Sequence, residues 1–491
     1  MYRCIPPGQL SFENFYLPFG GKLSGENRWV KLANLIPWEA VETEYSQQFS
    51  SSEGAPAKSC RVALGALIIK ERLGTSDEET VEQIRENPYL QYFLGFYEYQ
   101  DKAPFEASMF VHFRKRFSIE SVGRINEKIV EPWIESPPVE SDVVESDVVE
   151  LTESRNQDET EKSVSQEKGK EIDEINNQGH LIVDATCAPV DIQYPTDLRL
   201  LNEAREHTES IIDVLYESVG DKLPKKPRTY RQKARRDYLN MAKKRRPTAK
   251  QRRRAIGQQL AYVRRNLTHI DVLMGLGTSL TKLSRQQYRT LLVVSELFRQ
   301  QQCMYEQRSQ RIDDRIVSLA QPHVRPIIRG KASASVEFGP KLSASCSEGF
   351  VFIDHFSWNN FNESGYLQQQ AEAHKTRFGH YPQTIYADQI YRTKANRNWC
   401  KEHGVRLMGL PTEKLDKDEQ ATLRQQLRED EKIRNQIEGK FGQGKRRFSL
   451  SRVMAKLVST AETAIAISFL VMNLEHLLRQ VLLFIFCLVA Q

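Results

Sequence analysis

A long acidic segment in the first third of the chain most constrains how the chain can fold. Residues 135–174 contain fourteen acidic residues and only four basic ones, and the sequence Glu-Ser-Asp-Val-Val occurs twice in succession from residue 140. Such a segment has too little apolar surface to offset the entropy that is lost on ordering. We therefore expect a disordered acidic linker at residues 131–178, which separates an N-terminal domain at 1–130 from a larger domain at 179–491.

A basic segment follows the linker and reverses its charge. Residues 222–265 contain eighteen Lys or Arg and one acidic residue, Asp237, although the whole chain of 491 residues carries a net charge of only +6. A basic run is most often a solvated surface, but this density repels itself strongly unless a polyanion neutralises it. The phosphate backbone of double-stranded DNA is therefore the expected partner. The cations expected to contact phosphates are Arg231, Arg235, Arg236, Lys243, Lys244, Arg245, Arg246, Arg252, Arg253 and Arg254.

The N-terminal domain has the pattern of a helical, DNA-binding domain. Apolar residues recur at helical spacing in residues 60–73, Gly74 is a natural helix end, and a second short helix is expected to end at residues 87–88. Residues 109–117, which carry three successive cations, would form a third helix. Two short helices and a basic helix are typical of helix-turn-helix DNA-binding domains, but the same pattern suits a plain helical bundle.

Two apolar runs in the larger domain end in a carboxylate. Residues 180–184 and 383–388 have the pattern of buried strands, and their last residues are Asp184 and Asp388. Further strands are expected at 335–342, 349–356 and 405–410, with a helix at 393–403 and an inserted, mainly helical basic region at about 210–325. This order predicts an α/β fold in which helices cover a mixed sheet.

A third segment, residues 434–445, adds a carboxylate and two cations. At 100° per residue, Arg434 and Lys445 fall within about 40° of Glu438 on one helix face. Asp184, Asp388 and Glu438 together provide the oxygen ligands that a pair of Mg²⁺ ions prefers, with Mn²⁺ as an alternative ion. Two such ions about 3.5–4 Å apart promote in-line displacement at phosphorus, and the two cations would bind nearby phosphates. A single Asp at a strand end is more often a turn or a cap, so the metal interpretation depends on all three carboxylates.

Four further residues have two interpretations each. Trp358 would either stack on an extruded DNA base or pack against the sheet, which is the commoner role of such a Trp. Tyr194, Asn202 and Arg205 follow the first Asp closely in the sequence. They would either line the site or serve helix packing.

The cysteines and the apolar segments bear on the location of the protein. Seven cysteines are widely scattered without a Cys-x-x-Cys pair, which argues against a disulfide framework and a cysteine zinc site. The N-terminus has no continuous apolar core of a signal peptide. Residues 464–490 are very apolar but are interrupted by polar residues, so a packed terminal helix is expected rather than a membrane span. We therefore expect a cytoplasmic protein.

Several short motifs are shared with a known family. In the N-terminal domain they are Trp38, Glu86-Asn-Pro-Tyr-Leu-Gln-Tyr-Phe93 and Phe113-Arg-Lys-Arg116; in the larger domain they are residues 183–186, 194–197, 201–205, 386–388 and 438–445. On these motifs the chain resembles the DDE transposases of bacterial insertion sequences, in the insertion-sequence-five family of the insertion-sequence-four superfamily. The resemblance covers most of the chain except the acidic linker.

One position departs from the signature of this superfamily. The signature is Tyr, two residues, Arg, three residues, Glu, six residues, Lys; here Arg434, Glu438 and Lys445 keep the spacing, but Glu431 stands at the Tyr position. Glu431 would instead pair with Arg434 on the same helix face. Three glycines between Glu438 and Lys445 each weaken a helix, so a break before Lys445 is the competing expectation.

The resemblance implies a fold and an activity. It implies an RNase H-like core in which Asp184, Asp388 and Glu438 are the catalytic, metal-binding triad. It also implies an enzyme that binds the terminal inverted repeats of an insertion sequence, cleaves DNA with metal-activated water and joins the freed 3′-hydroxyl to target DNA by transesterification. Such an enzyme would act as a homodimer on DNA, in the bacterial cytoplasm at the nucleoid. A metal-dependent nuclease without strand transfer and an inactive DNA-binding relic are the two alternatives.

Overall fold

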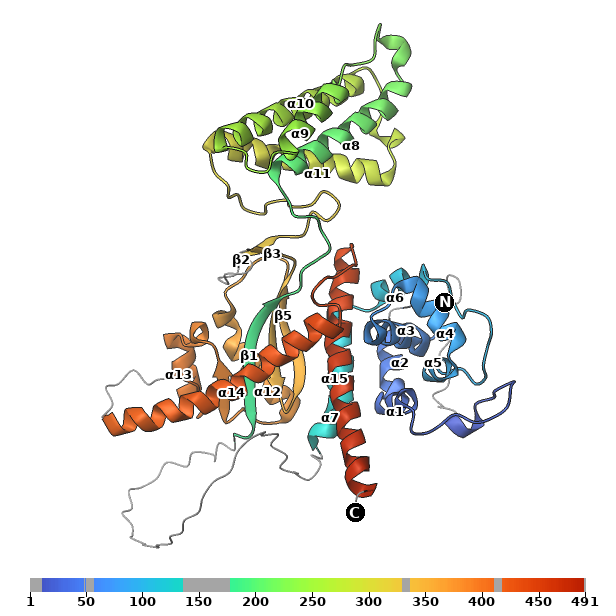
Figure 1. Ribbon diagram of the computed structural model, residues 1–491, viewed down its shortest axis with the longest axis vertical. Helices are drawn as coiled ribbons and strands as arrows, with labels where there is room; N and C mark the ends of the chain where they lie inside the picture. Colours follow the sequence, from blue (N-terminus) through green and yellow to red (C-terminus); the bar gives the residue numbers. More distant parts are fainter. Residues whose placement is uncertain are drawn as a thin grey trace.

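A computed structural model describes residues 11–47, 49, 57–135, 177–328, 336–409 and 417–489. Nearly all of the acidic linker lies outside these residues, so its predicted disorder stays a prediction. Three parts are visible: an N-terminal helical domain, a sheet covered by helices, and a helical insertion that extends from the sheet (Figure 1).

The N-terminal domain is helical, as its sequence predicts. Ser59 caps the helix at 60–73 by accepting a hydrogen bond from the N–H of Val62, and Gly74 ends it in the left-handed region at φ 68°. The next helix is capped by Ser76, which accepts from the N–H of Glu79. The helices are α1 (Arg28–Leu35), α2 (Trp38–Ser46), α3 (Cys60–Leu73), α4 (Asp77–Glu86), α5 (Pro88–Phe93) and α6 (Met109–Arg116).

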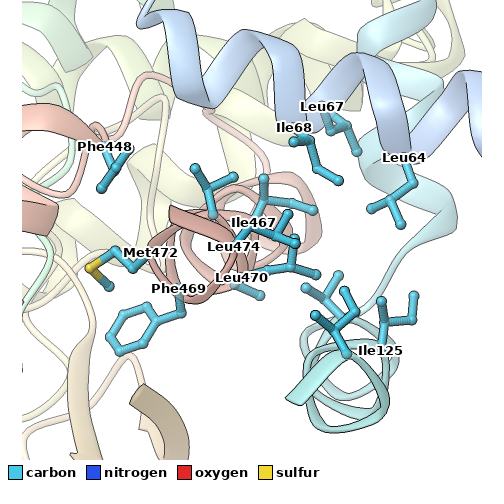
Figure 2. Close-up of a cluster of buried hydrophobic side chains, with 14 of the residues drawn as sticks. Leu64, Leu67, Ile68, Ile125, Phe448, Ile467, Phe469, Leu470, Met472 and Leu474 are labelled. Atoms are coloured by element: carbon cyan, nitrogen blue, oxygen red, sulfur yellow. The ribbon is translucent and has the colours of Figure 1, made fainter. Parts of the chain in front are cut away.

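Helix α15 (Val458–Val489) lies between the N-terminal domain and the sheet (Figure 1). It packs against α3, α6 and β5, and against α7 (Ile119–Glu135). Leu64, Ile68 and Ile125 face Leu470 and its neighbours on one side of α15 (Figure 2). By length and composition Val458–Phe484 could cross a membrane, but most of its apolar stretch is buried within the protein. A packed terminal helix is the arrangement that the sequence predicts.

The central sheet is mixed, which confirms the sequence prediction. Its strand order is β5-β4-β1-β6-β7; β1 is antiparallel to β4 and parallel to β6, and β6 is parallel to β7. The strands are β1 (His180–Cys187), β4 (Lys341–Ser347), β5 (Phe350–Ser357), β6 (Thr384–Ala387) and β7 (Arg406–Leu407). A separate pair, β2 (Pro326–Ile328) and β3 (Val336–Phe338), connects the sheet to the insertion.

Helices cover both faces of the sheet, and the alternation along β1 shows which face each residue meets. Leu181 and Val183 are buried in one cluster, with α12 (Leu367–Phe378) and α13 (Lys394–Glu402). Ile182 is buried in the other cluster, with residues of α14 (Lys417–Arg447) and α15. Because side chains alternate along a strand, Asp184 shares the α14 face with Ile182.

The insertion is a helical unit with apolar clusters of its own. It consists of α8 (Asp197–Glu217), α9 (Arg231–Ala242), α10 (Ala249–Gly275) and α11 (Arg285–Gln307). Helix α8 packs along α10 and α11, so the unit begins near residue 197 rather than at the predicted 210. The expected long helices are present, and they lie far from the N-terminal domain (Figure 1).

Candidate active site

The register of the two parallel strands brings Asp184 next to Asp388. Val183 is the register partner of Ala387, and each Asp is the next residue along its strand direction. Asp184 does not end its strand, however, because β1 stays paired with β4 as far as Cys187. The apolar run ends at Asp184 because β1 pairs with β6 only as far as Val183. The strand itself continues to Cys187, where it pairs with β4.

The third carboxylate comes from α14, which packs on β1 and β6. Ile437 and Phe441, one helical turn apart, are buried in the same apolar cluster as Ile182 of β1. Glu438 follows Ile437 and has half of its side chain exposed, so it lies at the edge of this contact. The helix thus holds Glu438 beside the sheet edge where the two Asp residues meet.

Electrostatics show that the three carboxylates are close enough to influence one another. Burial, together with the negative charges of Glu438 and Asp388, raises the pKa of Asp184 to about 6. The N–H of Ala185, which donates to Asp184 Oδ1 at 2.7 Å, and the guanidinium of Arg434 act in the opposite direction. The sequence prediction that these residues converge is consistent with this geometry.

Arg434 lies among these carboxylates on α14. Its Nη1 donates to Glu438 Oε1 at 3.1 Å, and its Nη2 lies 3.6 Å from Glu431 Oε2. Burial lowers the pKa of Arg434, but Glu431, Glu438 and Asp388 outweigh this effect and raise it. Glu431 therefore pairs with Arg434, as the departure from the signature suggests.

The helix is continuous up to Arg447, so the expected break before Lys445 is wrong. Gly444 meets a packing need here, because a Cβ at this position would lie 2.6 Å from Leu450 Cδ1. The half-buried Lys445 is in the last turn of α14, on the same helix face as Glu438.

The donor set suits a hard divalent cation. Asp184 and Asp388 each use Oδ1 to accept the N–H of the following residue, at 2.7 Å in both cases. Among the described residues no hydrogen bond engages either Oδ2, so one oxygen of each carboxylate is uncommitted. No three His, Cys, Asp or Glu side chains of the described part are grouped tightly enough to hold one ion. Oxygen donors of this kind are what Mg²⁺ and Mn²⁺ prefer.

The basic segment includes α9, the loop at residues 243–248 and α10 as far as residue 265, and most of its cations are exposed. Arg235, Arg236, Lys243, Lys244, Arg245, Arg246, Arg252 and Arg254 are exposed, and within the described ranges none forms an ion pair. Two of the expected contacts differ. Arg231 pairs with Asp213 at 2.9 Å, and Arg253 lies over the ring of Tyr305 at 4.2 Å.

A cavity of about 900 Å³ lies where the insertion meets β2 and β3. It has aromatic and apolar walls with several cations among its lining residues, which include Tyr194, Tyr238, Met241, Lys244, Arg252, Met304, Tyr305, Arg308 and Phe338. Tyr194 is 72% exposed and contacts Phe338 edge-on, so it faces this cavity rather than the carboxylates.

The basic helix α6 does not present three cations to solvent. Arg114 is buried and forms an ion pair with Asp77 of α4. Arg116 donates to Tyr45 Oη at 3.2 Å, and only Lys115 of the three is exposed. These contacts favour the helical-bundle interpretation for α3 to α6, and DNA binding by residues 1–130 stays a prediction.

The remaining ambiguous residues serve packing. Trp358 Nε1 donates to Glu462 Oε1 at 2.8 Å, and its ring meets His323 edge-on. Arg205 is 1% exposed and binds Glu209 and Asn202 inside the insertion, at 2.7 and 2.8 Å. Neither Trp358 nor Arg205 is therefore available to the candidate site in this arrangement.

Two residues of the site were not anticipated from the sequence. Tyr391 is fully buried beneath the site, and burial together with the charge of Asp184 raises its pKa. Asp430 is 3% exposed and binds both Nη atoms of Arg406, at 3.0 and 2.7 Å, which ties α14 to β7. Both contacts join distant segments, and the only local signal was the position of Tyr391 three residues after Asp388.

Comparison with known proteins adds a family context to this geometry. Residues 18–116 match the family described as "Transposase domain (DUF772)", and residues 385–475, which contain Asp388 and Glu438, match the family described as "Transposase DDE domain". The chain is 35% identical over 107 residues to "Uncharacterized protein ORF8 in nfe locus" of Rhizobium meliloti. That match covers 22% of this chain and about half, 51%, of the relative. No solved structure matches.

These matches define a class. Residues 18–116 and residues 385–475 are therefore each similar to domains of transposases.

Proposed function

We propose that the protein is a DDE transposase of the insertion-sequence-five family. It would bind the terminal inverted repeats, cleave at the transposon ends and join the 3′-hydroxyl to target DNA. Two observations support this proposal: the strand register that brings Asp184 next to Asp388, and the influence of the charges of Glu438 and Asp388 on Asp184. The strand order, three antiparallel strands followed by two parallel ones, supports the RNase H-like fold expected of this family.

Asp184, Asp388 and Glu438 would hold two Mg²⁺ ions, or Mn²⁺ in their place, with Oδ2 of each Asp uncommitted among the described residues. When bound, the ions supply an activated water and stabilise the attacking and leaving oxygens of an in-line displacement. Arg434 and Lys445 would hold phosphates beside the carboxylates. Cleavage replaces a P–O bond to the 3′-oxygen by a P–O bond to water, and joining replaces a target P–O bond by one to that 3′-oxygen. No covalent enzyme intermediate is required.

The insertion would bind the duplex. Eight exposed cations on α9, on α10 and in the loop between them form no ion pair among the described residues, which leaves their charge available to phosphates. Phosphate contacts position a protein on DNA but carry little base information, so recognition of the terminal repeats requires further contacts. Joining requires two transposon ends at once, which favours a homodimer assembled on DNA in the bacterial cytoplasm.

The test replaces each carboxylate by its neutral isostere. Asp184→Asn, Asp388→Asn and Glu438→Gln should each abolish Mg²⁺-dependent cleavage and leave DNA binding nearly intact, because each removes a ligand charge and preserves shape. Glu429→Gln, an exposed position on the same helix, is the matched control and should cleave normally. Cleavage near the wild-type rate in one of the three variants would remove that residue from the triad.

The same assay separates the alternatives. Wild-type protein that nicks but never yields strand-transfer products would be a nuclease. Protein that binds DNA without metal-dependent nicking would be the inactive relic.

A further inference from the structure

Helix α14 carries two carboxylates that share one guanidinium. Glu431, Arg434 and Glu438 are spaced three and four residues apart, which places them in one row on the helix surface. The Arg434 side chain is 14% exposed, whereas Glu431 and Glu438 are 55% and 52% exposed. The guanidinium therefore lies beneath two half-exposed carboxylates.

Arg434 binds the carboxylate that the proposed metal site needs. Its Nη1 is 3.1 Å from Glu438 Oε1, and it also interacts with the charge of Asp388. A carboxylate oxygen cannot face a guanidinium and a divalent cation at the same point, and the two cations repel each other. Binding of a divalent cation at Oε1 of Glu438 would therefore displace Arg434, and binding at Oε2 would weaken the contact through repulsion between the two cations.

Glu431 is the nearest alternative partner for the displaced guanidinium. Its Oε2 already lies 3.6 Å from Arg434 Nη2, and Asn435 Oδ1 accepts from the same Nη2 at 3.5 Å. A rotation of the Arg434 side chain toward Glu431 needs no change of the backbone, because both residues belong to one helix. A neutral Tyr, the signature residue at this position, would not offer a full negative charge.

We propose that Glu431 is a positioning residue that takes over Arg434 when a divalent cation binds Glu438. This inference rests on the proposed metal site at Asp184, Asp388 and Glu438. Arg434 competes with the cation for Glu438, and Glu431 relieves the competition. Loading of the cation then moves the guanidinium toward the outer edge of the site, where a phosphate of DNA would approach.

The test is a double-mutant cycle on Mn²⁺ binding by the full chain without DNA, measured by calorimetry or by electron paramagnetic resonance. Arg434→Met should bind Mn²⁺ about twofold to tenfold tighter, because the competitor is gone. Glu431→Gln should bind it weaker by a similar factor. In the Arg434→Met background, Glu431→Gln should have almost no further effect, because there is no guanidinium left to receive.

Glu429→Gln is the matched control for this cycle. It removes the same charge from an exposed position two residues away and should weaken Mn²⁺ binding by less than about twofold in both backgrounds. An equal effect of Glu431→Gln in both backgrounds would overturn the proposal, because Glu431 would then act only through the general field. Arg434→Gln replaces Arg434→Met if the latter loses its helical circular dichroism. If both unfold, equal effects of Glu431→Gln and Glu429→Gln would likewise overturn it.

A failure of the proposed function looks different. Wild-type protein that binds no Mn²⁺, or whose binding Glu438→Gln does not weaken, would remove the metal site itself. Wild-type binding that depends on Glu438, together with an additive cycle, would remove only the role of Glu431.

Discussion

The N-terminal domain and the insertion are both helical and both contain a basic helix, but they use its cations in opposite ways. In the N-terminal domain Arg114 pairs with Asp77, and Arg72 pairs with Glu475 of α15. In the insertion, Arg235, Arg236, Lys243, Lys244, Arg245, Arg246, Arg252 and Arg254 are exposed and have no such partners among the described residues. The position of carboxylates, rather than the number of cations, therefore decides whether a basic helix holds a fold together or is free to bind a polyanion.

The largest expected effect is on DNA binding by the insertion. Replacing Arg235, Arg236, Lys243, Lys244, Arg245 and Arg246 by Gln should weaken binding by orders of magnitude, equally for cognate and random duplexes. Each lost phosphate contact should reduce the slope of log affinity against log salt by roughly 0.9. Arg299→Gln, an exposed cation of α11 that pairs with Glu296, is the control. Loss of cognate binding alone, with an unchanged slope, would mean that the segment reads bases.

The second effect tests the cations of the N-terminal domain that form ion pairs within the protein. Arg114→Met should destabilise the protein by about 1–3 kcal/mol, because Asp77 loses its buried partner and keeps only its contact with Lys70 at 3.2 Å. Its neighbour Lys115→Met, which is exposed, should leave the melting temperature nearly unchanged. If Arg114→Met keeps its stability but loses DNA affinity, Arg114 contacts DNA, and the contrast between the N-terminal domain and the insertion is wrong.

The third effect concerns pH and the contact between α3 and α15. Burial raises the pKa of Glu71 from its ordinary value of 4.5 to about 7, although Ser468 donates to its carboxylate at 2.6 Å. The folded state thus binds a proton that the unfolded state releases between pH 4.5 and 7, so stability falls as pH rises through this range. At 1.36 kcal/mol per pKa unit the loss is at most about 3 kcal/mol.

Chemical denaturation at pH 5 and pH 8 measures this loss, with Glu71→Gln beside the wild type. The variant should lack this component of the pH dependence and be the more stable protein at pH 8. An identical pH dependence in both proteins would show that Glu71 keeps its ordinary pKa.

The smallest effect is expected from the acidic linker. Deleting residues 146–165, which roughly halves the linker, should shift the free energy of unfolding by less than about 1 kcal/mol, because loop closure changes by only about 0.6 kcal/mol per doubling of length. If the linker competes with DNA for the basic segment, deletion should raise affinity at low salt and have little effect above roughly 0.15 M. A large drop in melting temperature would instead give the linker a structural role.

Local pattern was sufficient for much of the fold and for the candidate carboxylates. The apolar runs before Asp184 and Asp388 identify two strands because burial on both faces leaves a continuous apolar signature. The spacing of Arg434, Glu438 and Lys445 places three side chains on one helix face, and the helix is there.

Long-range pairing accounts for what local pattern missed. Arg114 looks like a DNA-binding cation until Asp77, on another helix, is placed beside it. Gly444 looks like a helix breaker until Leu450 folds back against it. The pair Asp430 and Arg406 joins elements whose adjacency depends on the sheet order, which sequence periodicity does not encode.

The position of α15 has a consequence for how the protein is made. Leu64, Ile68 and Ile125 are synthesised early, but the helix that covers them is synthesised after every other described element. A nascent chain on the ribosome therefore exposes an apolar surface until translation has passed Leu474, and during that time it is a substrate for chaperones and proteases. Glu438 precedes α15, so the last carboxylate of the candidate site leaves the ribosome shortly before this surface closes. Translation that ends between Glu438 and α15 would release a chain that has all three carboxylates but lacks the helix that packs between the N-terminal domain and the sheet.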